Sequence, residues 1–132
     1  MRKTKFWSLV IGGILLLQSH AGVIARETTP PPVTESQSNS IALHQLPPQG
    51  VETYHLIHQG GPFPFEKDGV VFGNRERLLP AQQRGYYREY TVKTPRSRDR
   101  GARRIVCGGP VKTPDACYYT EDHYTTFRKI VN

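Results

Sequence analysis

A carboxylate and a histidine stand out among the polar side chains of the C-terminal half. Glu89 lies within Tyr86–Val92, whose β-branched and aromatic residues predict a strand, so its side chain shares one face with Tyr87 and Thr91. A carboxylate in the middle of a tyrosine-rich strand is unusual unless it is exposed or paired. His123 stands in a polar segment just before a second predicted strand, where an imidazole can titrate near neutral pH.

Between these two residues the chain carries a cluster of arginines. Five of them fall within nine positions, with Asp99 as the one acidic residue among them: Arg96, Arg98, Arg100, Arg103 and Arg104. A guanidinium group makes paired hydrogen bonds to phosphate oxygens. Arg103 and Arg104 open a predicted strand and must point to opposite faces, so only one of them can face Glu89. Taken by itself, the cluster is equally typical of a solvated basic loop.

Together these groups could cleave RNA without a metal. A carboxylate can take the proton of a ribose 2′-hydroxyl, and a protonated imidazole can protonate the leaving 5′-oxygen. Arginines can stabilise the charge that develops on the pentacoordinate phosphorus. The same residue types occur in basic proteins that bind nucleic acid without cleaving it. Residue types alone therefore leave an enzyme and a binding module open.

The composition is that of a small basic protein. The chain has 132 residues, of which 18 are Lys or Arg and 11 are Asp or Glu, and 36% of its residues are hydrophobic. These values exclude a collagen-like repeat and a multi-span membrane protein, and the length allows one small domain. The formal net charge of +7 favours polyanionic partners, although many basic proteins bind none.

Residues 1–25 have the features of a cleaved secretory signal peptide. Basic residues at positions 2, 3 and 5 precede the apolar run Phe6–Leu17, which is too short to span a bilayer. Small residues at signal-peptidase spacing allow cleavage after Ala21 or after Ala25. An uncleaved membrane anchor is the alternative. We expect a secreted protein, periplasmic if the host has an outer membrane, with no stable membrane association after cleavage.

The rest of the chain divides into a leader and one folded domain. Residues 26–40 are rich in Thr, Pro, Ser and Gln and predict a flexible leader, and residues 41–132 predict the domain. Apolar spacing predicts a short helix over Gln49–Gln59, which ends at Gly60-Gly61. Short strands are expected at Val70–Phe72, Tyr86–Val92, Arg103–Cys107, Tyr118–Thr120 and Tyr124–Val131. This order predicts an α+β fold, in which one N-terminal helix packs on an antiparallel sheet of four to five strands.

Cys107 and Cys117 are the two cysteines of the chain. An exported protein meets oxidising conditions, so a disulfide between them is expected, and two free thiols are the alternative. No further Cys or His lies nearby at the spacing of metal ligands, and no metal site is expected.

Several motifs follow one another as they do in the secreted microbial guanyl-specific ribonucleases: Gly61-Pro62-Phe63-Pro64-Phe65, Asp68-Gly69-Val70-Val71-Phe72, Asn74-Arg75-Glu76, Gly85-Tyr86-Tyr87-Arg88-Glu89-Tyr90-Thr91-Val92, Arg103-Arg104-Ile105 and Asp122-His123-Tyr124-Thr125-Thr126-Phe127. The chain resembles the bacterial branch of this family over about Leu46–Ile130. Several motifs in the right order are far more specific than any one of them. The resemblance implies the microbial ribonuclease fold.

The resemblance also implies catalytic roles. Glu89 matches the general base and His123 the general acid of the family, while Arg104 and Arg100 match the arginines that contact the phosphate. The implied reaction is cleavage of single-stranded RNA on the 3′ side of guanosine to a 2′,3′-cyclic phosphate, followed by slower hydrolysis to a 3′-phosphate. It needs no cofactor. Because Glu89 must be ionised and His123 protonated, a bell-shaped dependence of activity on pH is expected.

The resemblance implies a set of guanine-binding residues as well. Glu76 matches the carboxylate that accepts from guanine N1–H and the exocyclic amine, and Asn74 and Arg75 match the backbone donors to O6 and N7. Phe72 and Tyr124 stand where the family has aromatic walls around the base and the phosphate. Close relatives carry Gln at the position of Gly73, which predicts a looser hold on guanine.

The expected molecule is a monomer that acts on single-stranded RNA, and a cytosolic inhibitor protein of the barstar type is a candidate partner. Such an inhibitor would present acidic groups to Arg100 and Arg104. The rival interpretation is a secreted basic module that binds nucleic acid without catalysis. That module would bind in a salt-sensitive way and would be indifferent to loss of His123.

Overall fold

The computed structural model describes residues 12–13, 22 and 39–132. The predicted signal peptide, apart from three glycines, and the leader up to residue 38 lie outside the described residues. Within the described part, no helix is both long and apolar enough to cross a membrane.

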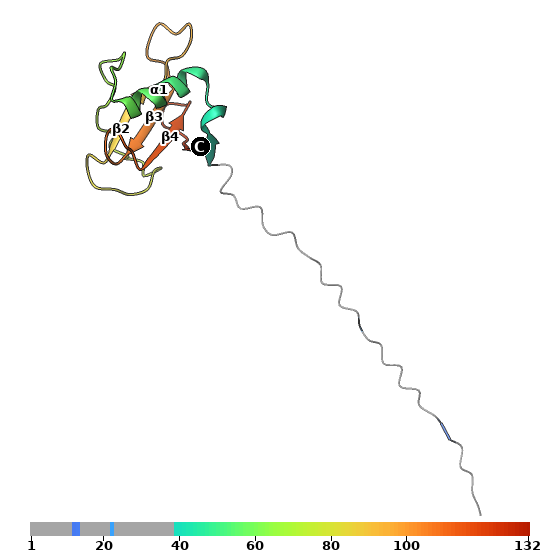
Figure 1. Cartoon of the computed structure of the whole chain (residues 1–132). Helices are drawn as coiled ribbons and strands as arrows, with labels where there is room; N and C mark the ends of the chain where they lie inside the picture. The colour runs from blue at the N-terminus through green and yellow to red at the C-terminus, as the bar shows by residue number, and fades with distance from the viewer. Residues whose placement is uncertain (1–11, 14–21, 23–38) are drawn as a thin grey trace, which may run out of the picture. The chain divides into compact units, whose positions relative to one another are not determined.

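One helix and a five-stranded sheet form the domain (Figure 1). Strand β1 (Ser40–Ala42) and a 3-10 turn at Leu43–Gln45 lead into helix α1 (Pro48–Gln59). The remaining strands are β2 (Tyr87–Thr91), β3 (Arg104–Gly108), β4 (Ala116–Thr120) and β5 (Arg128–Val131), and the spatial order is β1-β5-β4-β3-β2. The expected α+β fold with one N-terminal helix on a sheet is confirmed.

The sheet is mixed, and the prediction that it would be wholly antiparallel is wrong at one edge. Strand β1 runs parallel to β5, with Ile41 opposite Ile130, while the other neighbours pair antiparallel. Three residues are too few to show an alternating pattern, so β1 owes its place to burial of Ile41 at long range.

Two other expected strands differ from the prediction, since one is absent and the other is shorter. Val70–Phe72 is not a strand: Val71 makes a single bridge to Arg88, although Phe72 N–H still donates to the Tyr87 carbonyl at 2.9 Å. The segment expected from Tyr124 enters the sheet only at Arg128, because the preceding residues turn around the Asp122 carboxylate.

Helix α1 begins at a proline and ends at a glycine, the residues that are typical of helix ends. Pro48 occupies the first turn, where its missing N–H has no helical partner to lose, and Gly60 closes the helix with φ 82°. Ile57 is fully buried against the sheet, and the Thr53 hydroxyl is within hydrogen-bonding reach of the Thr91 carbonyl, at 3.2 Å. The helix is thereby fixed to the end of β2.

The two faces of the sheet have different partners. Tyr90, Ile105 and Tyr119 belong to the core shared with Ile57 of α1. The other face carries a smaller cluster of Leu79, Tyr87 and Val106, against which Phe72, Tyr86, Tyr118, Tyr124 and Phe127 pack. Because side chains alternate along a strand, Glu89 lies on this second face.

The two cysteines are joined, as expected. Cys107 of β3 and Cys117 of β4 stand directly opposite each other and form a disulfide, so the described residues hold no free cysteine. The bridge lies in the helix-side core, at the end of the hairpin remote from Arg104. It therefore ties together the two strands that support the arginine and the histidine loop.

Candidate active site

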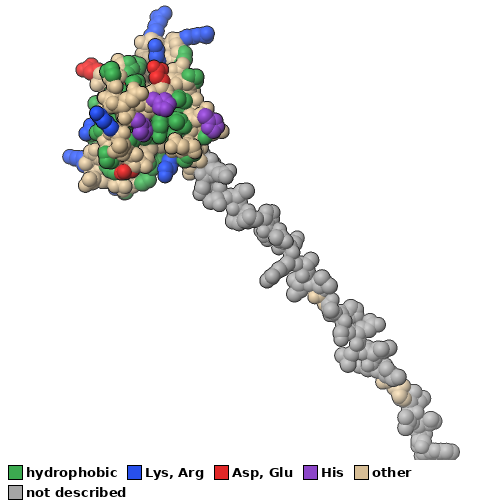
Figure 2. All heavy atoms as spheres, viewed as in Figure 1, with side chains coloured by type: hydrophobic (Ala, Val, Ile, Leu, Met, Phe, Trp, Pro, Cys, Tyr) green, Lys and Arg blue, Asp and Glu red, His purple; other side chains and the backbone are tan. Residues whose placement is uncertain are grey.

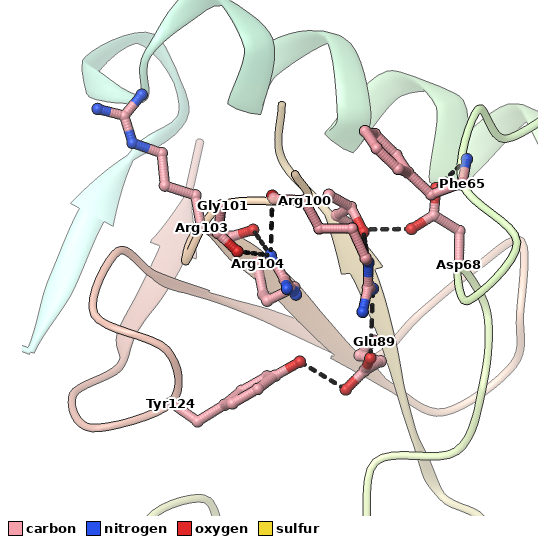
Figure 3. A network of polar contacts seen from close by, with 9 residues as sticks. Phe65, Asp68, Glu89, Arg100, Gly101, Arg103, Arg104 and Tyr124 are labelled. Carbon is pink, nitrogen blue, oxygen red and sulfur yellow. Dashed lines mark hydrogen bonds and ion pairs between the residues drawn. The ribbon is translucent and has the colours of Figure 1, made fainter. Parts of the chain in front are cut away.

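Glu89 and Arg100 form an ion pair on the open face of the sheet (Figure 3). Arg100 Nη2 lies 3.5 Å from Glu89 Oε1, and its Nε and Nη2 both donate to Thr91 Oγ1, at 3.0 and 2.8 Å. Thr91 is 2% exposed, so its hydroxyl group is held in place by the residues packed around it. Two hydrogen bonds to one acceptor hold the guanidinium of Arg100 in a single orientation toward the carboxylate.

The other carboxylate oxygen of Glu89 accepts from Tyr124. The phenol O–H donates to Oε2 at 2.6 Å, which is a short, charge-assisted hydrogen bond (Figure 3). Burial, together with the neighbouring Glu89, raises the pKa of Tyr124 to about 12. The phenol therefore stays protonated and remains a donor throughout the neutral range.

Arg104 lies beneath this pair and is 3% exposed. It stands opposite Thr91 in the ladder between β2 and β3, and its Nη1 donates to the carbonyls of Gly101 and Arg103 at 2.9 and 2.7 Å. Its Nε is buried and has no hydrogen-bond partner within the part of the chain that the structure describes. Arg103 points the other way (Figure 3), so of this adjacent pair only Arg104 faces Glu89, as the strand alternation requires.

His123 is held in a tight loop beside these residues. His123 and Tyr124 have φ values of 54° and 69°, in the left-handed region that non-glycine residues seldom adopt. The His123 N–H donates to the Ala102 carbonyl at 3.2 Å, and the Tyr124 N–H donates to Thr120 Oγ1 at the same distance. The imidazole itself is exposed, with its ring centre 4.8 Å from that of Tyr124.

Asp122 organises this loop. One carboxylate oxygen accepts from the Thr120 hydroxyl and the Thr126 N–H, both at 2.9 Å, and the other accepts from the Thr126 hydroxyl at 2.6 Å. The hydrogen bond from the Thr126 side chain, followed by that from its backbone, lowers the pKa of Asp122 from its ordinary value of 3.8 to about 2. An ionised Asp122 is thus the acceptor around which the backbone turns.

A pocket of about 450 Å³ opens beside Glu89 and His123. Seven of the nine residues expected to act on or bind substrate line it: Phe72, Asn74, Arg75, Glu76, Glu89, His123 and Tyr124. Arg100 and Arg104 are not among its lining residues, and they adjoin the pocket through Glu89 and Tyr124. The phenyl ring of Phe72 stacks on Tyr124, with ring centres 5.1 Å apart.

The pocket wall at residues 73–78 is shaped by Asn74. Its side-chain amide donates to the Leu79 carbonyl at 3.0 Å and accepts from the Leu79 N–H at 3.1 Å. With its side chain committed in this way, Asn74 can offer a ligand only its backbone. Glu76 is exposed at the pocket. At Gly73 an added Cβ would meet only the Arg75 side chain, at 3.6 Å, so the backbone there does not require glycine.

The positioning roles of two residues, Thr91 and Asp68, were not predicted from the sequence. Thr91 was expected to share a face with Glu89, but its hydrogen bonds to Arg100 depend on a loop whose path the sequence does not reveal. Asp68 was noted only as part of a family motif, whereas its carboxylate accepts from the Thr91 N–H at 2.7 Å and the Phe65 N–H at 3.2 Å. The sequence signal for this role of Asp68 was a carboxylate directly before a glycine and close to a predicted strand.

Comparison with known proteins identifies relatives for almost the whole described chain. The ribonuclease family model matches residues 29–131. Guanyl-specific ribonuclease St of Saccharopolyspora erythraea is 54% identical over 93 residues, covering 70% of this chain and 88% of the relative. Guanyl-specific ribonuclease Sa of Kitasatospora aureofaciens is 52% identical, with coverage of 70% and 94%.

Solved structures of a ribonuclease also match this chain. A structure of ribonuclease Sa2 in complexes with mononucleotides superimposes with a TM-score of 0.66 at 45% identity, covering 70% of this chain and 93% of that one. A structure of the same ribonuclease with guanosine-2′-cyclophosphate gives a TM-score of 0.63 at 46% identity, with coverage of 70% and 94%.

Replacing Asp122 should weaken the fold in a pH-dependent way. Because folding lowers the pKa of Asp122, its contribution to stability is present above its unfolded pKa near 3.8 and is lost as pH falls toward about 2. We expect Asp122→Asn to lower the urea midpoint near neutral pH, and the gap to the parent protein to narrow between about pH 4 and about pH 2.

Glu121→Gln is the matched control, since Glu121 is an exposed neighbour whose ion pair with Arg128 spans 3.4 Å. A surface pair of this kind contributes about 0–1 kcal/mol. A gap for Asp122→Asn that stays constant across the acid range would contradict the role given to the ionised carboxylate.

Proposed function

This chain belongs to the family of guanyl-specific microbial ribonucleases, and we propose that it cleaves single-stranded RNA after guanosine with Glu89 as base and His123 as acid. One observation carries the proposal: Glu76, Glu89 and His123 line the same pocket. A group that can select a base and a pair that can move protons are thus close enough to act on one nucleotide. The first step needs no nucleophile beyond the substrate's own hydroxyl.

In the first step the 2′-oxygen of guanosine attacks the adjacent phosphorus. Glu89 takes the 2′-hydroxyl proton, a bond forms between the 2′-oxygen and phosphorus, and the bond to the 5′-oxygen breaks. His123 gives its proton to that leaving oxygen, so the products are a 2′,3′-cyclic phosphate and a free 5′-hydroxyl. DNA lacks the 2′-hydroxyl and cannot follow this path.

Hydrogen-bond donors whose positions are already fixed would stabilise the negative charge that develops on the phosphate oxygens. Arg100 is oriented by Thr91, Arg104 is held by the carbonyls of Gly101 and Arg103, and Tyr124 carries a phenol that stays protonated. Donors already in place do not have to reorganise as charge develops, which makes such stabilisation effective. In the second step water opens the cyclic phosphate, with Glu89 now giving a proton and His123 taking one.

Guanine would be selected by Glu76 and the backbone of the loop around Asn74. A carboxylate accepts hydrogen bonds from guanine N1–H and the exocyclic amine, whereas adenine offers neither at those places. The backbone N–H groups of Asn74 and Arg75 would donate to O6 and N7. Leaving such polar groups unpaired against the wrong base costs about 1–3 kcal/mol for each group.

The first test is cleavage of the dinucleotides GpU, ApU, CpU and UpU by residues 26–132, purified in the presence of EDTA. We expect rapid conversion of GpU to guanosine 2′,3′-cyclic phosphate, identified by chromatography, and little reaction of the other three. Equal cleavage of all four would contradict the role of Glu76, with Gly73 as the first position to test by substitution to Gln.

Glu89→Gln and His123→Gln serve as the controls for the chemistry. Each should lower kcat by about 10²–10⁴-fold, since each removes one of the two proton-transfer groups. The double variant should fall little further, because the two groups act as a unit. Full activity in the double variant would refute the assignment, and RNA binding without cleavage by the parent protein would support a binding module instead.

Thr91 should act on the reaction through Arg100. We expect Thr91→Val, which keeps the shape but removes the acceptor of two hydrogen bonds, to lower kcat on GpU on the order of tenfold with a smaller change in KM. Thr91→Ser keeps the hydroxyl and should restore most of kcat. Equal losses of kcat in both variants would indicate packing rather than positioning of Arg100.

We also propose that the protein is exported as a monomer and that an inhibitor with acidic groups would cover Arg100 and Arg104. The disulfide between Cys107 and Cys117 supports an oxidising compartment. Material recovered from culture medium should have the intact mass of residues 22–132 or 26–132 and elute as a monomer. A mass that includes residues 1–21 would contradict signal cleavage.

A further inference from the structure

A second pocket, of about 530 Å³, adjoins the active-site pocket that contains Glu89 and His123. Residues 71–75, residues 82–85 and Tyr87 line it. Residues 71–75 also line the active-site pocket, so one short segment separates the two cavities. Exposed Lys and Arg side chains, in contrast, stand at several separate places around the domain in Figure 2, so charge by itself does not single out a surface. The reaction proposed above makes no use of the second pocket.

Gly73 leaves a gap in the segment that separates the two pockets. Its backbone lies outside the left-handed region that favours glycine. An added Cβ would contact only the side chain of Arg75, with Cγ at 3.6 Å and Nε at 3.8 Å. Neither backbone conformation nor packing therefore requires glycine at this position. The absent side chain leaves room for a ligand to pass close to the backbone from one pocket to the other, which is a common use of glycine.

The side chains that line the second pocket suit a nucleoside. Gln82 and Gln83 are exposed, and each amide can both donate and accept hydrogen bonds, as the edge of a base requires. Arg84 is also exposed, and it belongs to neither of the two ion pairs found among the described residues. No acidic residue lines this pocket, whereas Glu76 and Glu89 line the active-site pocket. The second pocket therefore does not repel a polyanion.

Both walls of the second pocket are fixed to the start of β2. On one wall the Phe72 N–H donates to the Tyr87 carbonyl at 2.9 Å. On the other wall the Tyr86 N–H donates to the Gln83 carbonyl at 3.2 Å, and the Tyr87 hydroxyl donates to the Pro80 carbonyl at 2.6 Å. The pocket is thus formed before any ligand binds, so that little binding energy is lost in ordering its walls.

The proposed reaction gives the RNA strand a direction across the site. Guanosine would lie with its base at Glu76 and its 3′-phosphate beside His123. The 5′-carbon and the 3′-oxygen leave a ribose in opposite directions, so the preceding nucleotide lies away from His123. The second pocket meets this condition, because it adjoins the active-site pocket along the segment next to Glu76. A third pocket, of about 570 Å³, does not, because it adjoins the active-site pocket at Thr125 and Phe127, next to the histidine.

We propose that the second pocket binds the nucleoside that precedes guanosine in the RNA, and that the connecting backbone crosses above Gly73. This rests on the proposed function, since guanosine in the active-site pocket sets the direction of the strand. The pocket accepts any base, because an amide side chain offers both a donor and an acceptor. Binding energy from this remote nucleoside raises kcat/KM without a new group at the reacting atoms.

The test compares three substrates with the same scissile bond: GpU, pGpU and ApGpU. The second adds only a phosphate to the 5′-oxygen of guanosine, and the third adds a whole nucleotide. For the parent protein, residues 26–132, we expect kcat/KM to be about tenfold higher on ApGpU than on GpU, within the range for one base held by protein side chains. The value on pGpU should stay within about twofold of that on GpU, since exposed charges contribute little.

Two substitutions at Gly73 test the path between the pockets. Gly73→Gln fills the gap and should remove most of the ApGpU advantage, whereas Gly73→Ala adds only a Cβ, for which there is room, and should keep it. Because Gly73 also lines the active-site pocket, the quantity compared is the ratio of kcat/KM on ApGpU to that on GpU within each variant. A parental ratio in Gly73→Gln would contradict the crossing at this residue.

Two glutamines test the pocket itself. The double variant Gln82→Ala with Gln83→Ala should lower kcat/KM on ApGpU severalfold more than on GpU. Gln59→Ala, which removes an exposed amide from α1, is the matched control and should leave the ratio unchanged. All three positions are exposed, so thermal unfolding should stay close to that of the parent protein.

The remaining outcomes count against the nucleoside site. An equal loss on both substrates in the double glutamine variant would overturn it, as would an advantage for pGpU as large as that for ApGpU. Cleavage of GpU without any advantage for ApGpU would overturn the nucleoside site alone. Failure of the parent protein to cleave GpU would overturn the proposed function, and the nucleoside site with it.

Discussion

The site depends on how the protein keeps two guanidinium groups next to a single half-buried carboxylate, that of Glu89. Burying charge is costly unless hydrogen bonds compensate for lost water. Arg104 meets this requirement with backbone carbonyls of the loop that precedes it, and Arg100 with the hydroxyl of Thr91. Among the described residues, neither arginine donates a hydrogen bond to a carboxylate other than that of Glu89. Positive charge is therefore left over at the place where a phosphate would arrive.

That arrangement is possible because β2 and β3 are held in register from both sides of the sheet. Thr91 pairs with Arg104, the Asp68 carboxylate binds the Thr91 N–H, and Thr53 of α1 is close to the Thr91 carbonyl. A slip of one residue would send Glu89 and Arg104 to the helix side. The contacts of Thr91 thus fix the end of β2 and also keep the side chains of Glu89 and Arg104 on the face opposite the helix.

Local patterns were enough to predict the strands that carry Glu89 and Arg104, because alternation and flanking glycine or proline act within a few residues. The paths of the loops, in contrast, were not predicted by local patterns. Residues 124–127 were expected to begin the last strand, and they turn instead because the Asp122 carboxylate accepts hydrogen bonds from three donors. Strand β1 depends on Ile41 finding Ile130, a contact between distant residues. Both features depend on side-chain pairing that periodicity does not record.

The proposed roles of individual residues came from the order of motifs, and the contacts explain why those residues could fill them. A site for RNA must set two carboxylates, Glu76 and Glu89, before a polyanion that they repel. The pocket offsets them with Arg75 and His123, and Arg100 and Arg104 act from behind Glu89. A carboxylate that reads a base can therefore face the substrate only where cations surround it. The basic balance of the chain is in this sense a condition of guanine recognition as well as of phosphate binding.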